Sequence, residues 1–466
     1  MSTPVAAALV RSRYLLLGAS PYRDAGGVEA WFGFVTRTAS LVRFGRTAHD
    51  ALRTGDLSGL EPAELERLAG LGVLVDREEN ELAAVTGRLR AGSARRQTRA
   101  VTIMPTSYCN MACDYCGQEH RKAAHDARRM DRTARRVEAM IADPETSAVK
   151  VTWFGGEPLL ALRVIREMSA RFTSAADRHG TAYSARMATN GSLLTVRTLE
   201  ELHLDWRLTS MELTIDGPEA VHNRRRIMRN SRGTFRRTVE VLGEVVRRGR
   251  VPGLDIRIRV NIDNGNEDHV TDLLDDLACL GLADRQVRIQ LSPVHSWGND
   301  VSAVELQANA YAGREARWLR TAEALGLYFV ALPGSTVSTT CIATSRSGEI
   351  IDTAGRIYSC SEHPLVPGVR DTQVVAEVAD LTGAAPRPAG AFDDWYDQVD
   401  SGGAQCARCP ILPVCGGSCP KLWRDGHLPC PSLRFNWEER LDIEVRRRGW
   451  IPVATAPRDL LAGAVR

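Results

Sequence analysis

The sequence predicts an α/β protein built on a partial (β/α)6 barrel, with a winged-helix-like module before the barrel and a Cys-rich domain after it. Six short aliphatic runs alternate with amphipathic helical stretches between residues 101 and 292, which is typical of parallel strands joined by right-handed crossovers. Residues 1–86 carry a separate apolar pattern, and the chain beyond about residue 335 is dense in Cys, Gly and Pro. A chain of 466 residues is long enough for several domains.

The expected barrel strands each end in a loop that carries small or polar residues. They are Val101–Ser107, Val149–Phe154, Ser184–Thr189, Met211–Asp216, Ile256–Ile262 and Val287–Ser292. Helices are expected between them, for example over 160–177, 235–248 and 268–280. Six units suit an open barrel, and barrels of this kind place their chemistry at the C-terminal ends of the strands.

The first 86 residues are expected to form a small winged-helix-like module. Short strands are predicted at Tyr14–Leu17 and Trp31–Val35, and a helix runs from Glu61-Pro62 to a stop at Gly72. GVLVD, a polar REEN turn and ELAAV then suggest a hairpin. The predicted boundaries are 1–86 for the module, 87–99 for a basic linker, 100–334 for the barrel, 335–445 for the Cys-rich domain and 446–466 for a tail.

Composition excludes several function classes. Apolar residues make up 44% of the chain and the net charge is +3, so bulk charge predicts no nucleic-acid partner. No apolar run approaches the roughly 18 residues of a membrane span. The N-terminal stretch lacks a basic region before its apolar run and is a poor signal peptide. The expected compartment is the cytoplasm, with no membrane partner.

Three of the 11 cysteines lie directly after the first strand, in the spacing Cys109-x3-Cys113-x2-Cys116. Three thiolates on a 4Fe–4S cube leave one iron without a protein ligand, and that iron can bind a small molecule. A zinc knuckle with His120 as the fourth ligand is the alternative. The position at the C-terminal end of a barrel strand favours the cluster.

The segment SYCNMACDYCGQEH, with the aromatic Tyr115 before its last Cys, resembles the cluster loop of the radical S-adenosylmethionine (SAM) superfamily. WFGGEPLL after the second strand resembles the second motif of that family. The resemblance implies that Gly155, Gly156 and Glu157 hold the amino group of the SAM methionine. Glycines allow a close backbone approach, and a carboxylate can accept from an ammonium group.

Two further segments resemble SAM-contacting stretches of the same family. ATNGSLL after strand three implies ribose contacts from Thr189 and Asn190, and TIDGPEAVHNRRR after strand four resembles a DGP-x-x-x-H-D-x-x-R stretch, with Asn223 in place of the Asp. Arg226 is then implied as the partner of the SAM carboxylate, a bidentate task suited to Arg. Asp216 is expected to cap a turn.

Seven cysteines between residues 341 and 430 resemble the pattern of the SPASM domain, which carries two auxiliary 4Fe–4S clusters. The resemblance implies an outer cluster bound by Cys406, Cys409, Cys415 and Cys430, and an inner cluster bound by Cys341, Cys360 and Cys419. Seven thiolates for two cubes leave the inner cluster with an open iron or a non-Cys ligand. A pair of zinc ribbons is the alternative. The eleventh cysteine, Cys279, is expected to pack on an apolar helix face.

The N-terminal module resembles the PqqD-like leader-binding domain fused to many enzymes that modify ribosomally made peptides, most clearly in GVLVDREENEL. Such domains bind a precursor peptide as an added β-strand. The expected edge lies among Tyr14–Leu17 and Trp31–Val35, where aromatic and aliphatic residues suit strand pairing. A plain structural extension is the alternative.

These resemblances identify the chain as a radical SAM/SPASM peptide maturase with three 4Fe–4S clusters. They imply that an electron donor such as flavodoxin or ferredoxin reduces the SAM cluster, and that a 5′-deoxyadenosyl radical then removes hydrogen from a precursor peptide. The expected product is a cross-link, either carbon–carbon or thioether.

Two other substrate classes compete with the precursor peptide. Anaerobic sulfatase maturases oxidise Ser or Cys to formylglycine, but in them an Asp follows the second SPASM Cys, where this chain has Ser361. A non-peptide small molecule is the other alternative. An iron–sulfur regulator that binds DNA through residues 1–86 would leave the GGEP motif unexplained.

Overall fold

The six expected barrel strands form one parallel run, in chain order, in the centre of the protein. The computed structural model describes residues 8–122 and 126–453. The strands are β7 (Thr98–Ile103), β9 (Ala148–Trp153), β10 (Ala182–Thr189), β11 (Leu208–Thr214), β13 (Asp255–Ile262) and β14 (Val287–Pro293). Each pairs in parallel with the next, so the predicted partial barrel is confirmed.

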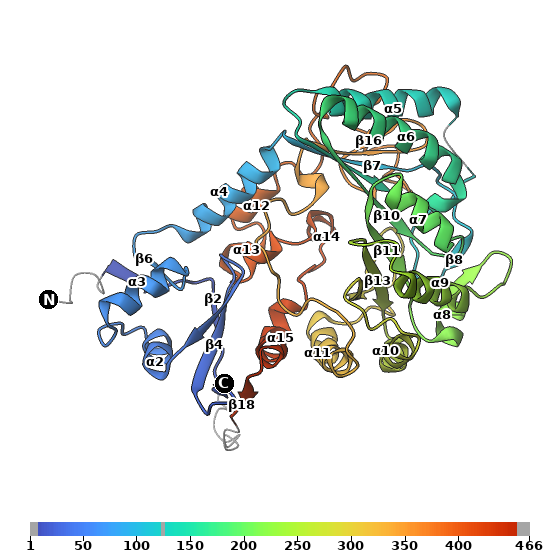
Figure 1. Cartoon of the computed structure of the whole chain (residues 1–466). Coiled ribbons are helices and arrows are strands. Elements are labelled where there is room, and N and C mark those ends of the chain that lie inside the picture. The colour runs from blue at the N-terminus through green and yellow to red at the C-terminus, as the bar shows by residue number, and fades with distance from the viewer. Residues whose placement is uncertain (1–7, 123–125, 454–466) are drawn as a thin grey trace.

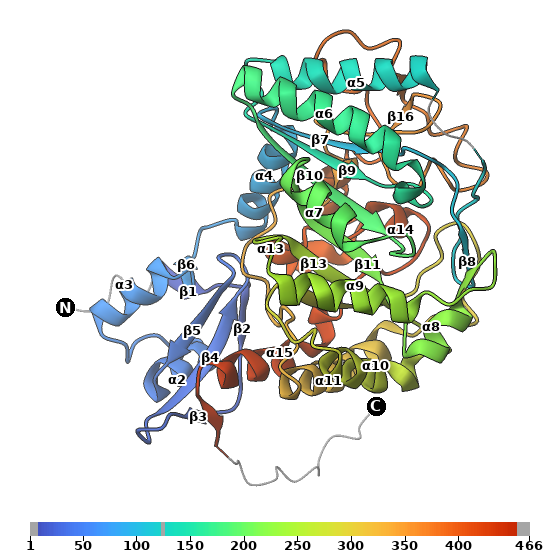
Figure 2. The same cartoon turned by 45° about the vertical axis from the view of Figure 1, so that its right-hand side comes forward.

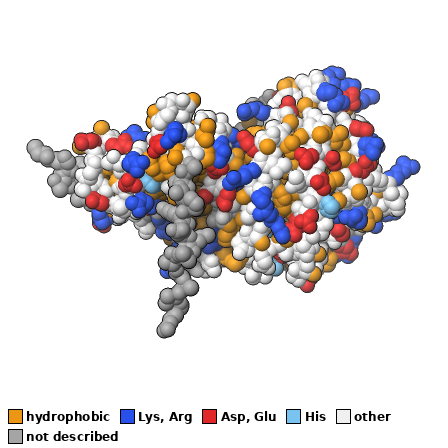
Figure 3. Space-filling model, turned by 90° about the horizontal axis from the view of Figure 1, so that it is seen from below, with side chains coloured by type: hydrophobic (Ala, Val, Ile, Leu, Met, Phe, Trp, Pro, Cys, Tyr) orange, Lys and Arg blue, Asp and Glu red, His pale blue; other side chains and the backbone are white. Residues whose placement is uncertain are grey.

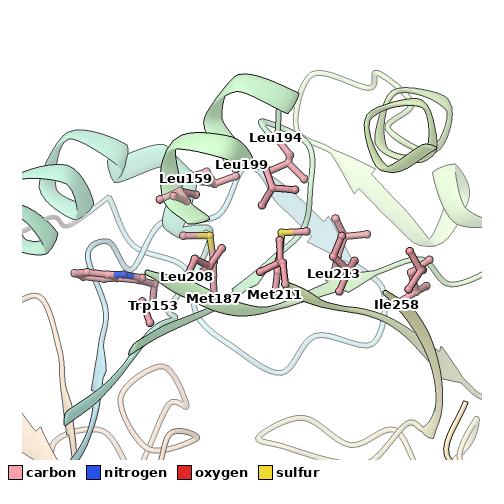
Figure 4. Close-up of a cluster of buried hydrophobic side chains, with 14 of the residues drawn as sticks. Trp153, Leu159, Met187, Leu194, Leu199, Leu208, Met211, Leu213 and Ile258 are labelled. Atoms are coloured by element: carbon pink, nitrogen blue, oxygen red, sulfur yellow. The ribbon is translucent and has the colours of Figure 1, made fainter. Parts of the chain in front are cut away.

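Helices cover the outer face of this sheet, as Figures 1 and 2 show. They are α5 (Ala127–Ala142), α6 (Leu162–His179), α7 (Val196–Leu204), α8 (Glu219–Arg225), α9 (Phe235–Arg248), α10 (Val270–Cys279) and α11 (Ala308–Ala324). Met187 and Met211, on neighbouring strands, point outward to Leu194 and Leu199 on the covering segments (Figure 4). These four side chains are at most 2% exposed, and burial of such apolar surface is the main stabilising contribution to the barrel.

Alternation along the strands sends the other set of side chains into the barrel. In β13, Ile256, Ile258, Val260 and Ile262 are buried, while the residues between them are half-buried. Because successive side chains point to opposite faces, Arg259 and Asn261 face the interior. The barrel interior therefore carries polar side chains, which a purely structural core would not.

The Cys-rich region extends the barrel sheet, which the sequence did not indicate. β15 (Gly348–Ile351) pairs in parallel with β7, and β16 (Arg356–Tyr358) and β17 (Ala376–Glu377) follow as antiparallel strands. The rest of the region consists of short helices, α12 (Trp395–Asp400), α13 (Leu412–Cys415) and α14 (Pro420–Arg424), and the longer α15 (Leu433–Arg447). This pairing fixes the position of Cys360, two residues after β16, relative to the barrel.

The N-terminal module contains an antiparallel sheet of β2 (Leu15–Leu17), β3 (Tyr22–Arg23), β4 (Glu29–Val35) and β5 (Ser40–Phe44). One face packs on α2 (Arg46–Thr54) and α3 (Pro62–Gly70). The other face packs against α13 and α15 through Leu16, Phe32 and Phe34. The module is therefore attached to the Cys-rich region across an apolar interface, as its place beside α15 in Figure 1 shows.

Two sequence expectations for this part of the chain are wrong. The second strand of the predicted hairpin is instead the start of helix α4 (Glu81–Ala94), which Asn80 caps by accepting from the Ala83 N–H at 3.1 Å. β6 (Leu74–Asp76) pairs with β1 (Leu9–Arg11). Since α4 runs to Ala94 and packs on α12, most of the expected linker is helix.

The expected tail also takes part in the fold. α15 continues to Arg447, and β18 (Ile451–Pro452) pairs with β3 of the N-terminal module. Residues 454–466 of the expected tail lie outside the described residues. The C-terminal segment thus adds a strand to the N-terminal sheet.

The described residues contain no helix that is both long enough and apolar enough to cross a membrane. Figure 3 shows one face of the molecule, on which Lys and Arg side chains are mixed with Asp and Glu rather than gathered in one area.

Phe34 tests the interface between the module and the Cys-rich region. Its side chain is 1% exposed and packs among Ile411, Val414 and Leu441. Phe34→Ala should lower the free energy of unfolding by about 3–5 kcal/mol, because it removes buried surface and leaves a cavity. Chemical denaturation measures the loss. Val28→Ala, at a residue 55% exposed, is the control, and equal stability of the two variants would contradict the interface.

Candidate functional site

A cavity of about 470 Å³ opens at the C-terminal ends of the barrel strands. All but one of the residues predicted to bind SAM or its cluster line it. They are Cys109, Cys113, Tyr115, Cys116, Gly155, Gly156, Thr189, Asn190 and Arg226. Glu157 is absent from this lining. The fold thus brings together residues from four separate loops.

The three thiols lie on a loop that is anchored at both ends. Cys109 follows β7, and β8 (Met111–Cys113) pairs antiparallel with β12 (Arg226–Met228), which places Cys113 opposite Arg226. Burial raises the pKa of the Cys109 thiol to about 11 and also raises the pKa values of Cys113 and Cys116. A thiolate at these positions needs a nearby cation, and iron bound by the thiols would supply it.

Tyr115 is held in a buried polar network. Its hydroxyl donates to Asp216 at 2.5 Å and accepts from Arg226 at 2.5 Å and from the Asn261 amide at 3.1 Å. Asp216 also accepts from the Asn261 N–H at 2.8 Å. Asp216 is completely buried, so the expected turn-capping role was too narrow. This carboxylate joins β11, β13 and the cluster loop.

Arg226 combines a buried charge with an unused donor. Its guanidinium lies 3.6 Å from Asp216, and within the described part of the chain its Nε has no hydrogen-bond partner. A buried N–H without a partner is costly. A carboxylate bound in the cavity could satisfy it, so this residue fits a SAM ligand, although the implied contact stays a prediction.

The Gly155–Gly156 turn packs against the backbone of the cluster loop. A Cβ on Gly156 would lie 2.3 Å from the Tyr108 carbonyl oxygen, and one on Gly155 would lie 2.5 Å from that of Thr106. Gly155 also has a φ of 122°, which favours glycine. Both glycines are therefore required because this turn lies against the backbone of the cluster loop. The sequence instead predicts that they allow the backbone to approach a ligand.

Glu157 does not face the cavity as the resemblance implied. The side chain is fully buried, and its oxygens accept from the Leu159 N–H at 3.0 Å, the Thr189 hydroxyl at 2.7 Å and the Asn190 N–H at 2.7 Å. Burial raises its pKa. Glu157 thus ties the loop after β9 to the loop after β10 and positions the two predicted ribose contacts.

Asn190 connects the same loop to the cluster loop. Its amide nitrogen donates to the Asn110 side-chain oxygen at 2.9 Å and lies 3.7 Å from the Cys109 sulfur. Its carbonyl oxygen accepts from the Ser192 N–H at 3.0 Å. The Asn190 side chain is thereby fixed beside the first thiol.

His120, the alternative zinc ligand, contacts the thiol of Cys116. Its Nε2 is 3.7 Å from the Cys116 sulfur, and its Nδ1 is 3.3 Å from the Ser107 carbonyl oxygen. In residues 8–122 and 126–453, no three His, Cys, Asp or Glu side chains form a group that could hold a single metal ion.

Four cysteines of the Cys-rich region surround one small cavity. Cys406, Cys409, Cys415 and Cys430 all line it, and Arg434 donates to the Cys430 sulfur at 3.0 Å. Burial, reinforced by the neighbouring thiols, raises the pKa of both Cys406 and Cys415 to about 12. Four thiols facing one space, with a cationic donor on one of them, fit a four-Cys cluster.

Cys341, Cys360 and Cys419 form a second group. Cys341 and Cys360 pack together beside Phe392, and Cys419 precedes α14. Burial raises the pKa of each thiol, and the Cys419 thiol adds to the rise in pKa of both Cys341 and Cys360. The structure thus brings together the three cysteines implied for the inner cluster.

Several residues that line the barrel cavity were not predicted from the sequence. They are Arg259, Asn261, His295, Trp297 and Glu362. The alternation DIRIRVNI in β13 could have indicated Arg259 and Asn261, since a strand buried on both faces would be apolar throughout. No sequence signal marks the other three.

The surroundings of His295 and Cys279 follow only from the tertiary structure. His295 Nδ1 lies 2.7 Å from a Glu305 carboxylate oxygen, which orients its ring. Cys279, at the end of α10, is exposed. The prediction that it packs in an apolar face is therefore wrong, because the helix ends there.

An open parallel barrel with three thiols grouped after its first strand places a candidate cluster site at the end of the barrel where such enzymes keep their active sites. Residues 103–277 match the family model described as the radical SAM superfamily. This part of the chain is therefore a radical SAM domain, the domain of an enzyme superfamily whose members bind a 4Fe–4S cluster and SAM.

The chain is similar to anaerobic sulfatase-maturating enzymes in both sequence and fold. The chain is 24% identical over 338 residues, 67% of this chain and 77% of the relative, to a serine-type anaerobic sulfatase-maturating enzyme of Klebsiella aerogenes. The solved structure of anSMEcpe with bound AdoMet, which is SAM, has a TM-score of 0.55 at 15% identity, covering 75% of this chain and 97% of that one. That likeness shows a shared fold.

A further solved structure, SuiB of Streptococcus suis bound to precursor peptide SuiA, has a TM-score of 0.46 at 13% identity, over 91% of this chain and 98% of that one. At this level of similarity, neither a common fold nor a common substrate follows.

Glu157→Ala separates the two roles considered for this carboxylate. It leaves three buried donors without an acceptor, so the free energy of unfolding of the SAM-free protein should fall by about 3 kcal/mol. Glu219→Ala, which removes an exposed carboxylate paired with Arg236, should change it by less than about 1 kcal/mol. Chemical denaturation without SAM measures both, and an unchanged stability of Glu157→Ala would favour the direct SAM contact.

Proposed function

We propose that this protein uses SAM and three 4Fe–4S clusters to install a cross-link, carbon–carbon or thioether, in a ribosomally made precursor peptide. The observation that carries the proposal is the grouping of the cysteines. Three line the barrel cavity, three form the inner group and four surround one small cavity. Only the exposed Cys279 stands outside these groups.

In the barrel, Cys109, Cys113 and Cys116 hold the first cluster and leave one iron for SAM. When bound, the cluster and SAM supply a radical that removes hydrogen from an unactivated C–H bond. The chain's own residues orient SAM. Arg226 offers its free Nε to the SAM carboxylate, and Thr189 and Asn190 lie where the ribose would bind. The Gly155–Gly156 backbone lines the cavity beside them.

The Cys-rich region holds two auxiliary clusters in this proposal. Cys406, Cys409, Cys415 and Cys430 bind the outer one, and Cys341, Cys360 and Cys419 bind the inner one. Cross-linking removes an electron from the substrate after hydrogen abstraction, so an acceptor is needed close to the cavity. An electron donor such as flavodoxin or ferredoxin supplies the electron that starts each turnover.

In this proposal the precursor peptide binds to the N-terminal module as an added strand. Of the two predicted segments, Tyr14–Leu17 still offers an edge, because β2 pairs with β4 alone within the described residues. Trp31–Val35 belongs to β4, which already pairs with β2 and β3 on one side and β5 on the other. Within the described residues, β5 pairs with β4 alone. Its other edge can therefore accept a strand, and main-chain hydrogen bonds would supply affinity.

The contact between the module and α15 supports this use of the edge. The apolar interface holds the sheet at a fixed position relative to the Cys-rich region. A leader bound along β5 would therefore hold the rest of the peptide near the cavity. The effective concentration of the rest of the peptide at the cavity rises when the linking segment matches the distance between the two sites.

Formylglycine formation is the second candidate function. The 24% identity to a serine-type anaerobic sulfatase-maturating enzyme favours it, and a related solved structure contains a Cp18Cys peptide. Ser361 after the second SPASM Cys counts against it. A small-molecule substrate becomes the better candidate only if the module binds no peptide.

Iron content tests the three clusters. Protein reconstituted without oxygen should hold about 12 iron atoms, four in each cluster, and replacing Cys109, Cys113 and Cys116 by Ala should remove about one third of them. Colorimetric iron and sulfide assays measure this. Cys279→Ala is the matched control, since an exposed thiol outside the three groups should leave the count unchanged.

The same samples report on SAM chemistry. Reduced wild-type protein should release 5′-deoxyadenosine from SAM, and the triple variant should not. Iron near four atoms in the wild type, or stoichiometric zinc, would contradict the three-cluster proposal.

Hydrogen exchange tests the peptide site in the full-length protein. Leader binding should slow exchange of those amides of β5, within residues 40–44, that point away from β4, because the added strand accepts their N–H groups. The β4 amides, which already lie between two strands, should change little. A scrambled leader is the control. Binding without protection of β5 would place the peptide elsewhere, and no binding would favour the small-molecule alternative.

A further inference from the structure

The proposed reaction releases a proton that a group in the cavity must accept. The substrate C–H bond gives its hydrogen atom to the 5′-deoxyadenosyl radical. The carbon radical then bonds to a thiol sulfur or an aromatic carbon, which loses a proton, while one electron passes to an auxiliary 4Fe–4S cluster. Formylglycine formation has the same balance, because the oxidised Ser or Cys loses its O–H or S–H proton. Either reaction therefore needs a base beside the substrate.

His295 lies in the cavity on a segment that is fixed to the cluster loop. It follows the last barrel strand, β14, by two residues, and both it and Trp297 line the cavity. The two rings meet edge to face, with centroids 6.3 Å apart and planes at 83°. The Asn299 amide donates to the Tyr115 carbonyl oxygen at 3.2 Å, and a Cβ on Gly117 would lie 2.4 Å from the Asn299 side-chain oxygen. These contacts hold the His295 segment beside the three thiols.

Glu305 leaves one nitrogen of this imidazole free. His295 Nδ1 lies 2.7 Å from a Glu305 carboxylate oxygen, and the two side chains are 25% and 22% exposed. Glu305 is not one of the residues that line the cavity. In residues 8–122 and 126–453, His295 Nε2 has no hydrogen-bond partner. A neutral imidazole that donates from Nδ1 to a carboxylate carries its lone pair on Nε2, which can then accept a proton.

The other His and Glu side chains of the cavity suit this role less well. His120 has the Cys116 sulfur 3.7 Å from one ring nitrogen and a backbone carbonyl oxygen 3.3 Å from the other. Glu212 pairs with Arg257 at 3.3 Å, and a paired cation makes a carboxylate a weaker base. Glu362 also lines the cavity and is the competing proton acceptor that the experiment separates from His295.

We propose that His295 is the general base of the barrel cavity. Its Nε2 takes the proton that the substrate loses in the oxidation step, and Glu305 is a positioning residue that holds the ring in the required tautomer. The Glu305 carboxylate then faces the imidazolium that forms, and this pairing stabilises it. The assignment rests on the proposed function, which supplies the reaction. It applies to cross-linking and to formylglycine formation alike.

The first test needs no substrate. Diethyl pyrocarbonate acylates an imidazole nitrogen that carries a free lone pair, and the probe is added to reconstituted full-length protein without SAM. It should modify His295 faster than the buried His222, whose ring nitrogens lie 3.3 Å from the Asp216 backbone nitrogen and 3.0 Å from the Thr234 hydroxyl. Glu305→Gln should slow the modification of His295. Peptide mass spectrometry measures both, and equal rates for the two histidines would overturn the assignment.

The second test follows hydrogen and product separately. The probes are the peptides encoded by short reading frames beside this gene and the Cp18Cys peptide, each with deuterium on its side-chain carbons. Wild-type protein should transfer deuterium to 5′-deoxyadenosine and form product. His295→Gln should still transfer deuterium but form at least about 100-fold less product. His295→Ala should regain part of the product when imidazole is added. His269→Gln, at a residue whose side chain is 46% exposed, is the control.

The outcomes separate the two proposals. No deuterium transfer by the wild type from any of these peptides would overturn the proposed function, and the His295 assignment with it. Undiminished product from His295→Gln would overturn the assignment alone, and so would loss of its deuterium transfer, which would mark a role in binding. Loss of product confined to Glu362→Gln would make that carboxylate the base. If His295→Gln does not hold its iron, Glu305→Gln decides, since it keeps the ring and should lower product formation without stopping deuterium transfer.

Discussion

The close contact between the Gly155–Gly156 turn and the backbone of the cluster loop is the constraint on which the site depends. A side chain on either glycine would overlap a carbonyl oxygen of that loop. The contact is secured by the Glu157 N–H, which donates to the Tyr108 carbonyl at 2.9 Å. It sets the position of Cys109, and through the Glu157 side chain it also sets the loop that carries Thr189 and Asn190. One contact between two backbones thereby fixes the first thiol, the glycine turn and the predicted ribose contacts.

The buried hydrogen-bond network around Tyr115 fixes another part of the cavity wall, where the cluster loop meets Asp216, Arg226 and Asn261. Asp216 and Arg226 form a partly compensated charge pair, and Asn261 joins them to the next strand. A buried ion pair is weak evidence for stability, because desolvation opposes its attraction. Here the Asp216–Arg226 pair serves to position other groups. It holds the Cys113 segment against β12 and leaves the Nε of Arg226 for a ligand.

The Cys-rich region and the N-terminal module are parts of one packed assembly. β15 extends the barrel sheet at β7, α15 packs on the N-terminal sheet, and β18 pairs with β3. The buried apolar cluster joins residues of the N-terminal sheet to residues of α13 and α15. The barrel, the Cys-rich region and the N-terminal module are therefore held at fixed positions relative to one another. This arrangement suits a reaction that moves an electron from a bound peptide to a neighbouring cluster.

The sequence by itself determined the six strands, their parallel order and the location of the first three thiols, because period-two burial and strand-end loops are local properties. It also separated the seven later cysteines from the rest. Only the tertiary structure decided that Glu157 faces the neighbouring loop, that Asp216 is buried, and that Trp31–Val35 is a central strand. The tertiary structure also placed Glu362, which belongs to no motif, in the lining of the barrel cavity. Each of these depends on which distant backbone lies beside the residue, and long-range contacts leave no periodic trace in the chain.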